Sequence, residues 1–348
     1  MRLTVRQGLW TGGPDVDPPP LAAVLEVSGA VLEWTVDEPD SLPRITLTDL
    51  DAADWLWRLV GAEGHARLLE ADSTTPLEVD LDHEALAPLR RLALGHWMSR
   101  WWPASARDGI VALDGAVLGA ELAVLTAALE EYFAEDTFDS DVDGLLAGLA
   151  GLTSYTADPR VADLLDACAE LGDLPDIGTT PTRWRADFAL VAGGDPRLDP
   201  SAALASGTDS VSWTAVPPGV FDAAEDTVTW SVAMTGPAGE GLVARVRAAL
   251  TDPAAGHPLS AGIRVALRSG DVAAAGELGA DGDATLPLAL TESAAWNHDW
   301  AATSIRVGVG EGETRETRDR VRRFVRTRLA APPADAFVAE MLAADDDF

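Results

Sequence analysis

The chain has 348 residues, of which 47% are hydrophobic and 24% charged, and its formal net charge is −32. This composition is typical of globular proteins, and the length exceeds what one hydrophobic core usually organises, so we expect two domains. The negative charge repels the phosphate backbone of nucleic acid and therefore argues against nucleic-acid binding.

The cysteine content and the apolar segments favour a cytoplasmic protein. The single cysteine, Cys168, has no internal disulfide partner, and no basic stretch followed by an apolar run precedes Pro18-Pro19-Pro20. The longest apolar stretches, such as residues 116–129, contain Glu121 and are shorter than the ~20 residues that a bilayer requires. We therefore expect a cytoplasmic protein that does not contact a membrane.

All 25 lysine-plus-arginine positions are arginine, and Asn297 is the only asparagine. Selection against a lysine-directed modification would explain the missing lysine. A GC-rich genome explains it too, and it also accounts for the scarcity of Asn and Ile. We favour the second interpretation, which indicates an actinobacterial or similar source.

The first half of the chain is typical of a mixed module in which strands precede helices. Polar and apolar residues alternate over residues 3–5, 31–37 and 44–48, which predicts three strands. Asp49 or Asp51 is expected to cap a short helix that carries Trp55 and Leu59, and residues 68–81 are expected to be extended. Apolar spacings of three and four then predict helices over residues 82–102, 114–133, 142–152 and 158–171.

The second half is typical of an antiparallel β-sandwich. Alternation predicts seven strands, over residues 184–190, 211–215, 228–234, 242–250, 263–267, 285–290 and 305–309. Ala280-Asp281-Gly282-Asp283 predicts a hairpin turn. Residues 276–290 around this turn resemble transthyretin-like and carboxypeptidase regulatory-like modules, which mostly bind or space other domains.

These patterns together predict an α+β fold, with a C-terminal antiparallel sandwich and an appended helix. The expected domains are a mixed α/β module with a helical middle (1–172), a linker (173–182), an Ig-like or transthyretin-like β-sandwich (183–312), and C-terminal helices with an acidic tail (313–348).

One segment resembles a calcium-binding loop. Asp139-Ser140-Asp141-Val142-Asp143-Gly144 reproduces the first six positions of an EF-hand loop, but Ala147 and Ala150 stand where further ligands are required. We interpret these aspartates as caps for a helix that begins near Val142, and we expect no bound metal.

No pattern of catalytic residues emerges. The five histidines, which show no zinc-ligand spacing, are His65, His83, His96, His257 and His298. The chain also contains no GxSxG motif, which would place a nucleophilic serine on a tight turn. A Walker A loop is ruled out because there is no lysine, and the glycines of residues 308–312 lie beside glutamates that would repel a phosphate. We expect no catalytic residue and no cofactor, although the 57 acidic residues leave carboxylate-pair chemistry open.

Two local features are candidate docking surfaces. Residues 313–331 predict a helix on which Arg315, Arg318, Arg322 and Arg326 share one face. One interpretation is an ordinary surface helix, in which the helix dipole favours glutamates at the start and arginines towards the end. The other is a docking face for a partner, or a clamp that binds the acidic first half of the chain. Tryptophans gather at the end of the helix that begins at Asp82, where they form either core or a docking surface: Trp97, Trp101 and Trp102.

A mixed module followed by a sandwich, the motif Trp-Met-Ser-Arg-Trp-Trp-Pro at residues 97–103 and the Asp-rich end at residues 345–347 give the chain a family resemblance. It resembles uncharacterised accessory proteins of actinobacterial multi-gene NTPase or peptidase defence (conflict) systems. That resemblance implies a protein partner, an NTPase or a peptidase, and assigns no site residues.

The predicted function is therefore a non-enzymatic protein-interaction or regulatory adaptor that acts with a separately encoded enzyme. Two alternatives remain open at this point. One is a carboxylate-dependent hydrolase with its site between the two domains. The other is a self-assembling structural subunit.

Overall fold

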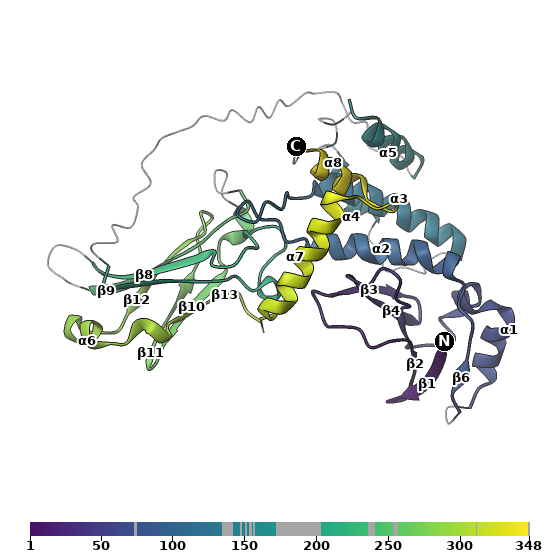
Figure 1. Cartoon of the computed structure of the whole chain (residues 1–348), viewed down its shortest axis with the longest axis horizontal. Helices are drawn as coiled ribbons and strands as arrows, with labels where there is room; N and C mark the ends of the chain where they lie inside the picture. The colour runs from purple at the N-terminus through teal and green to yellow at the C-terminus, as the bar shows by residue number, and fades with distance from the viewer. Residues whose placement is uncertain are drawn as a thin grey trace. The chain divides into compact units, whose positions relative to one another are not determined.

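The computed structural model describes residues 1–72, 75–133, 142–146, 148–149, 152, 155, 157–171, 203–235, 241–252, 257–310 and 312–346 (Figure 1). The chain forms two compact units. The first comprises Met1–Trp102, Leu113–Thr180 and Arg315–Phe348, and the second comprises Pro103–Ala112 and Pro181–Thr314. The fold is α+β, as the sequence predicts, while the predicted linker (173–182) lies outside the described residues.

The first unit contains a six-stranded antiparallel sheet with the order β3-β4-β5-β2-β1-β6. Its strands are β1 (Arg2–Arg6), β2 (Leu9–Gly12), β3 (Ala22–Val27), β4 (Ala30–Thr35), β5 (Arg44–Leu47) and β6 (Leu77–Glu78). The three strands predicted from alternation are confirmed as β1, β4 and β5. Gly29 turns the chain between β3 and β4 at φ +72°, and a Cβ atom there would lie 2.1 Å from the carbonyl oxygen of Asp49, so only glycine fits.

Seven of the α-helices among the described residues belong to this unit, and Figure 1 labels each of them. They are α1 (Trp57–Glu70), preceded by the 3₁₀ turn η1 (Asp54–Leu56), then α2 (His83–Trp101), α3 (Gly115–Phe133), α4 (Val142–Leu146), α5 (Pro159–Glu170), α7 (Arg315–Ala330) and α8 (Val338–Asp346). The carboxylates of Asp82, Asp114 and Asp158 accept hydrogen bonds from the first backbone N–H groups of α2, α3 and α5.

Two expectations for the region around α1 are wrong. Residues 68–70 are helical rather than extended. They form the last turn of α1, and the side chain of Leu68 on this turn is buried. Asp49 does not cap the helix, since its carboxylate accepts hydrogen bonds from the N–H groups of Asp51 and Ala52, and η1 begins without a side-chain cap.

The core of the first unit lies where α2 packs on β3 and on α3. Trp97 of α2 is buried and donates a hydrogen bond from Nε1 to the carbonyl oxygen of Pro20, at 2.6 Å. A Cβ atom at Gly95 would lie 2.5 Å from Leu122 Cδ2 and 2.8 Å from Phe337 Cζ, so the glycine lets α2 approach α3 and the segment before α8. The C-terminal segment is thus part of this core.

The second unit is an antiparallel β-sandwich of a four-stranded sheet, β12-β9-β8-β7, and a three-stranded sheet, β11-β10-β13. The strands are β7 (Ala205–Asp209), β8 (Val228–Thr235), β9 (Gly241–Ala248), β10 (Arg264–Ser269), β11 (Val272–Glu277), β12 (Asp283–Leu288) and β13 (Ser304–Val307). Val265, Leu267 and Ile305 of one sheet share a hydrophobic core with Trp230, Val246 and Leu286 of the other. Short helices complete the unit: η4 (Trp213–Ala215), η5 (Pro258–Ser260), α6 (Glu292–Asn297) and η6 (Trp300–Ala302).

Five of the predicted strands, at residues 228–234, 242–250, 263–267, 285–290 and 305–309, are confirmed as β8, β9, β10, β12 and β13. Residues 211–215 do not pair as a strand, because the Glu313 carboxylate accepts hydrogen bonds from the N–H groups of Trp213 and Thr214 and holds them in a 3₁₀ turn. The predicted hairpin turn does form, with Gly282 N–H donating to the carbonyl of Gly279 at 3.1 Å. Its two strands belong to different sheets, however, since β11 pairs with β10 and β12 pairs with β9. Residues 184–190 lie outside the described part of the chain.

The order of the described strands differs from that of an immunoglobulin constant domain. There the strands divide as ABED and CFG, so no three consecutive strands lie in the same sheet. Here β7, β8 and β9 are consecutive neighbours in one sheet. The sandwich architecture is therefore present without that strand order.

Candidate functional site

The arginine helix, α7, belongs to the first unit and does not present its four candidate arginines as one open face. Arg315 and Arg326 are exposed, Arg318 is half-buried, and Arg322 is only 4% exposed, with Asp319 Oδ1 at 3.1 Å from its Nη1. Because Arg322 is buried, its side chain packs inside the first unit and is not accessible to a partner.

A clamp onto the acidic first half does exist, but a neighbouring arginine makes it. Arg320 of α7 donates to both carboxylate oxygens of Asp37, at 2.9 and 2.8 Å, and to Asp17 Oδ2 at 2.5 Å. These two carboxylates raise the pKa of Arg320. The contact fastens α7 to the loops that flank β3 and β4.

Two of the three candidate tryptophans are core residues. Trp97 is 2% exposed and packs edge-on against Phe324 of α7, with ring centroids 5.6 Å apart. Trp102 is also buried. Trp101 is half-buried, and the guanidinium of Arg100 lies 4.1 Å from its ring centroid. The tryptophans at the end of α2 therefore belong mainly to the core of the first unit, and only Trp101 is partly accessible to a partner.

The histidines and Cys168 do not assemble a reactive centre. Burial lowers the pKa of His96, and His298 hydrogen-bonds Ser269 Oγ at 2.9 Å. Cys168 is buried, and burial raises the pKa of its thiol. No group of three or more His, Cys, Asp or Glu side chains suited to a metal ion occurs among the described residues. Residues 139–141 of the EF-hand-like segment lie outside them.

A buried carboxylate pair does occur, but the fold itself uses it. Burial raises the pKa of Glu121, and the charge of Glu340 acts in the same direction. Glu121 accepts from Arg91 Nη2 at 2.6 Å and from the N–H of Val338 at 2.7 Å. Glu340, at 0% exposure, accepts from Arg328 and from the N–H of Phe337. Every one of these carboxylate oxygens already has a protein donor, so this pair serves to attach α8 to α3 and α7.

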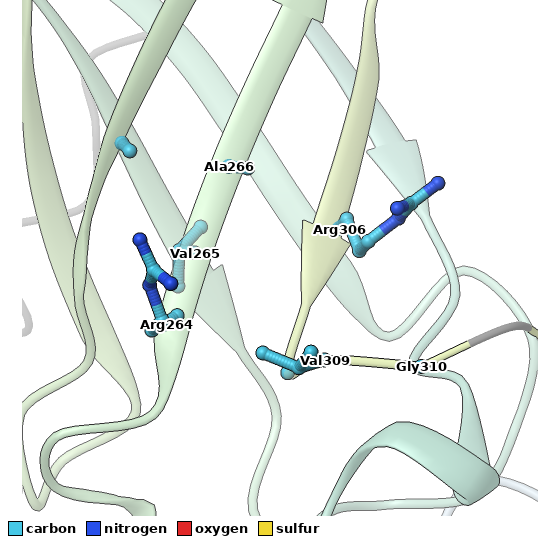
Figure 2. A pocket seen from close by; sticks show the side chains of 8 residues that line it. Arg264, Val265, Ala266, Arg306, Val309 and Gly310 are labelled. Atoms are coloured by element: carbon cyan, nitrogen blue, oxygen red, sulfur yellow. The ribbon is translucent and has the colours of Figure 1, made fainter.

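The second unit has a shallow, arginine-lined hollow on the outer face of its three-stranded sheet. The hollow has a volume of about 200 Å³, and Figure 2 shows the side chains of Arg264 and Arg306 at this hollow together with Val309. An adjoining hollow of about 220 Å³ continues along the same two strands to Arg268. We call these three arginines, Arg264, Arg268 and Arg306, the arginine face.

The strand register explains why the arginines meet. Val265 and Leu267 of β10 point into the core, so the alternating residues Arg264, Ala266 and Arg268 point outward. Ala266 pairs directly with Arg306 of β13. On the other side Ala266 pairs with Ala275 of β11, a small residue that leaves the hollow open.

The floor and rim of the hollow are apolar and small. Ala266 and Ala275 form the floor, and Gly308 turns the chain after β13 at φ +82°. A Cβ atom at Gly308 would lie 2.0 Å from the carbonyl oxygen of Ala215, which requires glycine there. Val309 follows at the rim and is 72% exposed, one of the most exposed large apolar side chains of the described residues.

No ion pair joins Arg264, Arg268 or Arg306 to an acidic side chain within the ranges that the structure describes. By contrast, Arg247 on the opposite sheet pairs with Asp283 at 3.6 Å. Three exposed cations thus gather on one sheet face of a chain whose net charge is −32.

Sequence reasoning did not single out these residues. The signal was present as arginines at every second outward position of two predicted strands, between the buried residues Val265, Leu267, Ile305 and Val307. The seven arginines of α7 give a stronger signal in the sequence, because they lie within one short segment.

No family model, curated protein or solved structure matches this chain. Within the part of the chain that the structure describes, no helix is long and apolar enough to cross a membrane.

Proposed function

We propose that this chain is a non-enzymatic protein-interaction or regulatory adaptor that acts with a separately encoded enzyme, and that the arginine face is its docking surface. The observation that carries the proposal is the set of three exposed arginines without an ion-pair partner in the described residues. The resemblance to accessory proteins of defence systems supports an NTPase or a peptidase as the enzyme.

The electrostatics favour binding rather than stability as the reason for this cluster. Arg306 is the diagonal neighbour of both Arg264 and Arg268, a placement of like charges that adds nothing to the stability of the sheet, and Glu277, directly opposite Arg264, is the only acidic residue at the outward positions of these three strands. A local cationic surface on an acidic protein attracts an acidic partner and orients it during encounter. Arginine is also enriched in protein interfaces, where its planar donors pair with carboxylates.

The two alternatives have less support. A carboxylate-dependent hydrolase needs an accessible pair of acidic groups, whereas the buried pair Glu121 and Glu340 is saturated by Arg91, Arg328 and backbone N–H groups. A self-assembling subunit would have to bring copies together against a net charge of −32 on each.

The test is affinity purification of the tagged chain from the organism that encodes it, followed by mass spectrometry. The docking variant is Arg264→Gln/Arg306→Gln. The matched control is Arg245→Gln/Arg247→Gln, which removes two exposed arginines from β9 on the other sheet. We expect one enzyme to be retained stoichiometrically by the wild type and the control, and to be lost from the docking variant.

The purified enzyme and the purified chain should then form the same complex when mixed, with the same dependence on the arginine face. A chain that is recovered alone, or an enzyme that the docking variant retains fully, would contradict the proposal. Far-UV circular dichroism and thermal melting of both variants check that the fold is intact.

A further inference from the structure

Resting on the proposed function, we infer that the arginine face binds an extended, carboxylate-rich segment of the partner protein. Its acidic side chains would stand at alternate positions and contact Arg264, Arg306 and Arg268 in turn. The inference rests on the chemistry of the face, on the spacing of the arginines and on the shape of the hollow.

The chemistry of the face favours carboxylates on a polypeptide over nucleic acid. A guanidinium group donates two parallel hydrogen bonds to a carboxylate, a geometry that it also offers to phosphate. Single-stranded nucleic acid, however, is bound by aromatic side chains on which its bases stack. The outward positions of β10, β11 and β13 carry only Arg, Ala, Glu and Ser.

The spacing of the arginines favours an extended segment over a helix. Arg264 and Arg268 are four residues apart on one strand, or about 13 Å, and Arg306 lies beside the midpoint on the next strand, about 5 Å away. Acidic residues at positions i and i+4 of an extended segment are also about 13 Å apart. In a helix the same two positions rise by only about 6 Å. An extended segment therefore reaches both ends of the face with acidic residues only four positions apart, and it places a third one beside Arg306, whereas a helix would need acidic residues about eight positions apart.

The shape of the hollow favours side chains over a separate small molecule. Neither of the two adjoining hollows, at about 200 and 220 Å³, reaches by itself the ~300–1,000 Å³ typical of small-molecule sites. The first hollow is open and shallow, with Ala266 and Ala275 at the floor. Exposed Val309 at the rim adds an apolar contact for the residues that alternate with the acidic ones.

Glu277 restricts where the acidic segment of the partner can lie on the sheet. It is exposed on the edge strand β11 and pairs directly with Arg264 of β10. A carboxylate of the partner that extended past Arg264 over β11 would meet this like charge. The acidic residues are therefore expected to follow β10 and β13 rather than β11.

The test measures binding of fluorescent peptides to the full chain by anisotropy. The probe is a nine-residue peptide that alternates Glu with Thr, and the matched probe replaces every Glu with Gln. We expect the Glu peptide to bind at least about tenfold more tightly than the Gln peptide. We also expect Arg264→Gln/Arg306→Gln to weaken it about tenfold, and Arg245→Gln/Arg247→Gln to change it less than about twofold. Higher salt should weaken the binding.

Two further probes distinguish other occupants. A helical peptide with the same number of Glu residues should bind more weakly than the extended one, and so should a single-stranded RNA oligonucleotide. Tighter binding of either, equal loss in both arginine variants, or no binding of the Glu peptide would overturn the inference.

These outcomes separate the inference from the proposed function. If the enzyme is lost with the arginine face while no extended acidic peptide binds, the adaptor function stands and this choice of occupant fails. If no enzyme is captured, the adaptor function fails, whereas peptide binding through the three arginines still supports recognition of an acidic segment.

Discussion

Single buried charges fasten the C-terminal segment, and the pair of Arg328 and Glu340 is the clearest case. Glu340 is 0% exposed and accepts from Arg328 Nε and Nη2, at 2.5 and 2.7 Å. Removing one partner of a buried pair leaves the other charge uncompensated and typically costs about 3–5 kcal/mol. We therefore predict that Arg328→Met lowers the free energy of unfolding of the first unit by about that amount, measured by urea denaturation.

The double variant Arg328→Met/Glu340→Gln provides the control. Gln removes the buried charge but keeps an acceptor for the N–H of Phe337, as Glu or Gln does at this position of a helix start. It should recover roughly half of the lost stability or more. A double variant as unstable as Arg328→Met would show that packing of the Arg328 side chain, rather than its charge, is what matters.

Glu313 gives a prediction that depends on pH. Burial alone would raise the pKa of its carboxyl group, but hydrogen bonds from Trp213 N–H, Ser212 Oγ and Thr214 N–H lower that pKa below its ordinary value of 4.5. A lowered pKa in the folded state means that the stabilisation is present above the unfolded pKa and is lost as the pH falls through the folded one.

We predict that Glu313→Gln destabilises the second unit on the order of 1 kcal/mol at neutral pH, after allowing for solvent screening. The difference in melting temperature between wild type and variant should shrink below about pH 4.5, because Glu313 of the unfolded wild-type chain then binds a proton before the folded carboxylate does. A difference that stays constant down to about pH 3 would refute the role of the charge.

At the scale of elements, the sequence predicted those features that depend on neighbouring residues. The helices predicted from Asp82 and Asp158 are confirmed, and each of these aspartates caps the helix that follows it. Residues 211–215 alternate like a strand but form a 3₁₀ turn, because Glu313 binds the backbone of Trp213 from 100 positions further along the chain. Local alternation carries no information about such a partner.

The turn at residues 280–283 illustrates the same limit. Its residues specify a tight turn, and the turn forms with Gly282 at φ +79°. Which strand each arm pairs with is decided elsewhere: β12 pairs with β9 over six positions, and β11 with β10 over six. The turn thus joins the two sheets of the sandwich instead of closing a hairpin within one.

The arginine face was equally hard to predict from the sequence. Alternation over residues 263–267 and 305–309 predicts two strands with outward arginines. That Ala266 pairs with Arg306, and so places the arginines on one face, depends on two strands about 40 positions apart becoming neighbours. The type of each element was predictable, while their juxtaposition was not.

For the whole molecule, the compact units do not follow the order of the chain. The sequence indicates consecutive segments, with residues 313–348 after the sandwich, whereas Arg315–Phe348 is part of the first unit. Phe337 against Gly95 and Leu122, and Arg320 on Asp17 and Asp37, make this connection. Such contacts span more than two hundred residues and leave no local pattern in the sequence.

The placement of α7 and α8 leads to a prediction for the two units separately. A chain that ends at Thr314 loses Phe324 and Phe337, the aromatic partners of Trp97 and Gly95, and leaves Glu121 without the N–H of Val338. We predict that hydrogen exchange becomes faster in α2 and α3 and stays unchanged in β8 and β9. A chain that ends at Ala344 loses the exposed pair of Arg160 with Asp345 but keeps Phe324, Phe337 and Val338, so it is the control and should protect α2 and α3 as the full chain does. Equal loss of protection in both units, or none in α2 and α3, would show that the C-terminal helices do not belong to the core of the first unit.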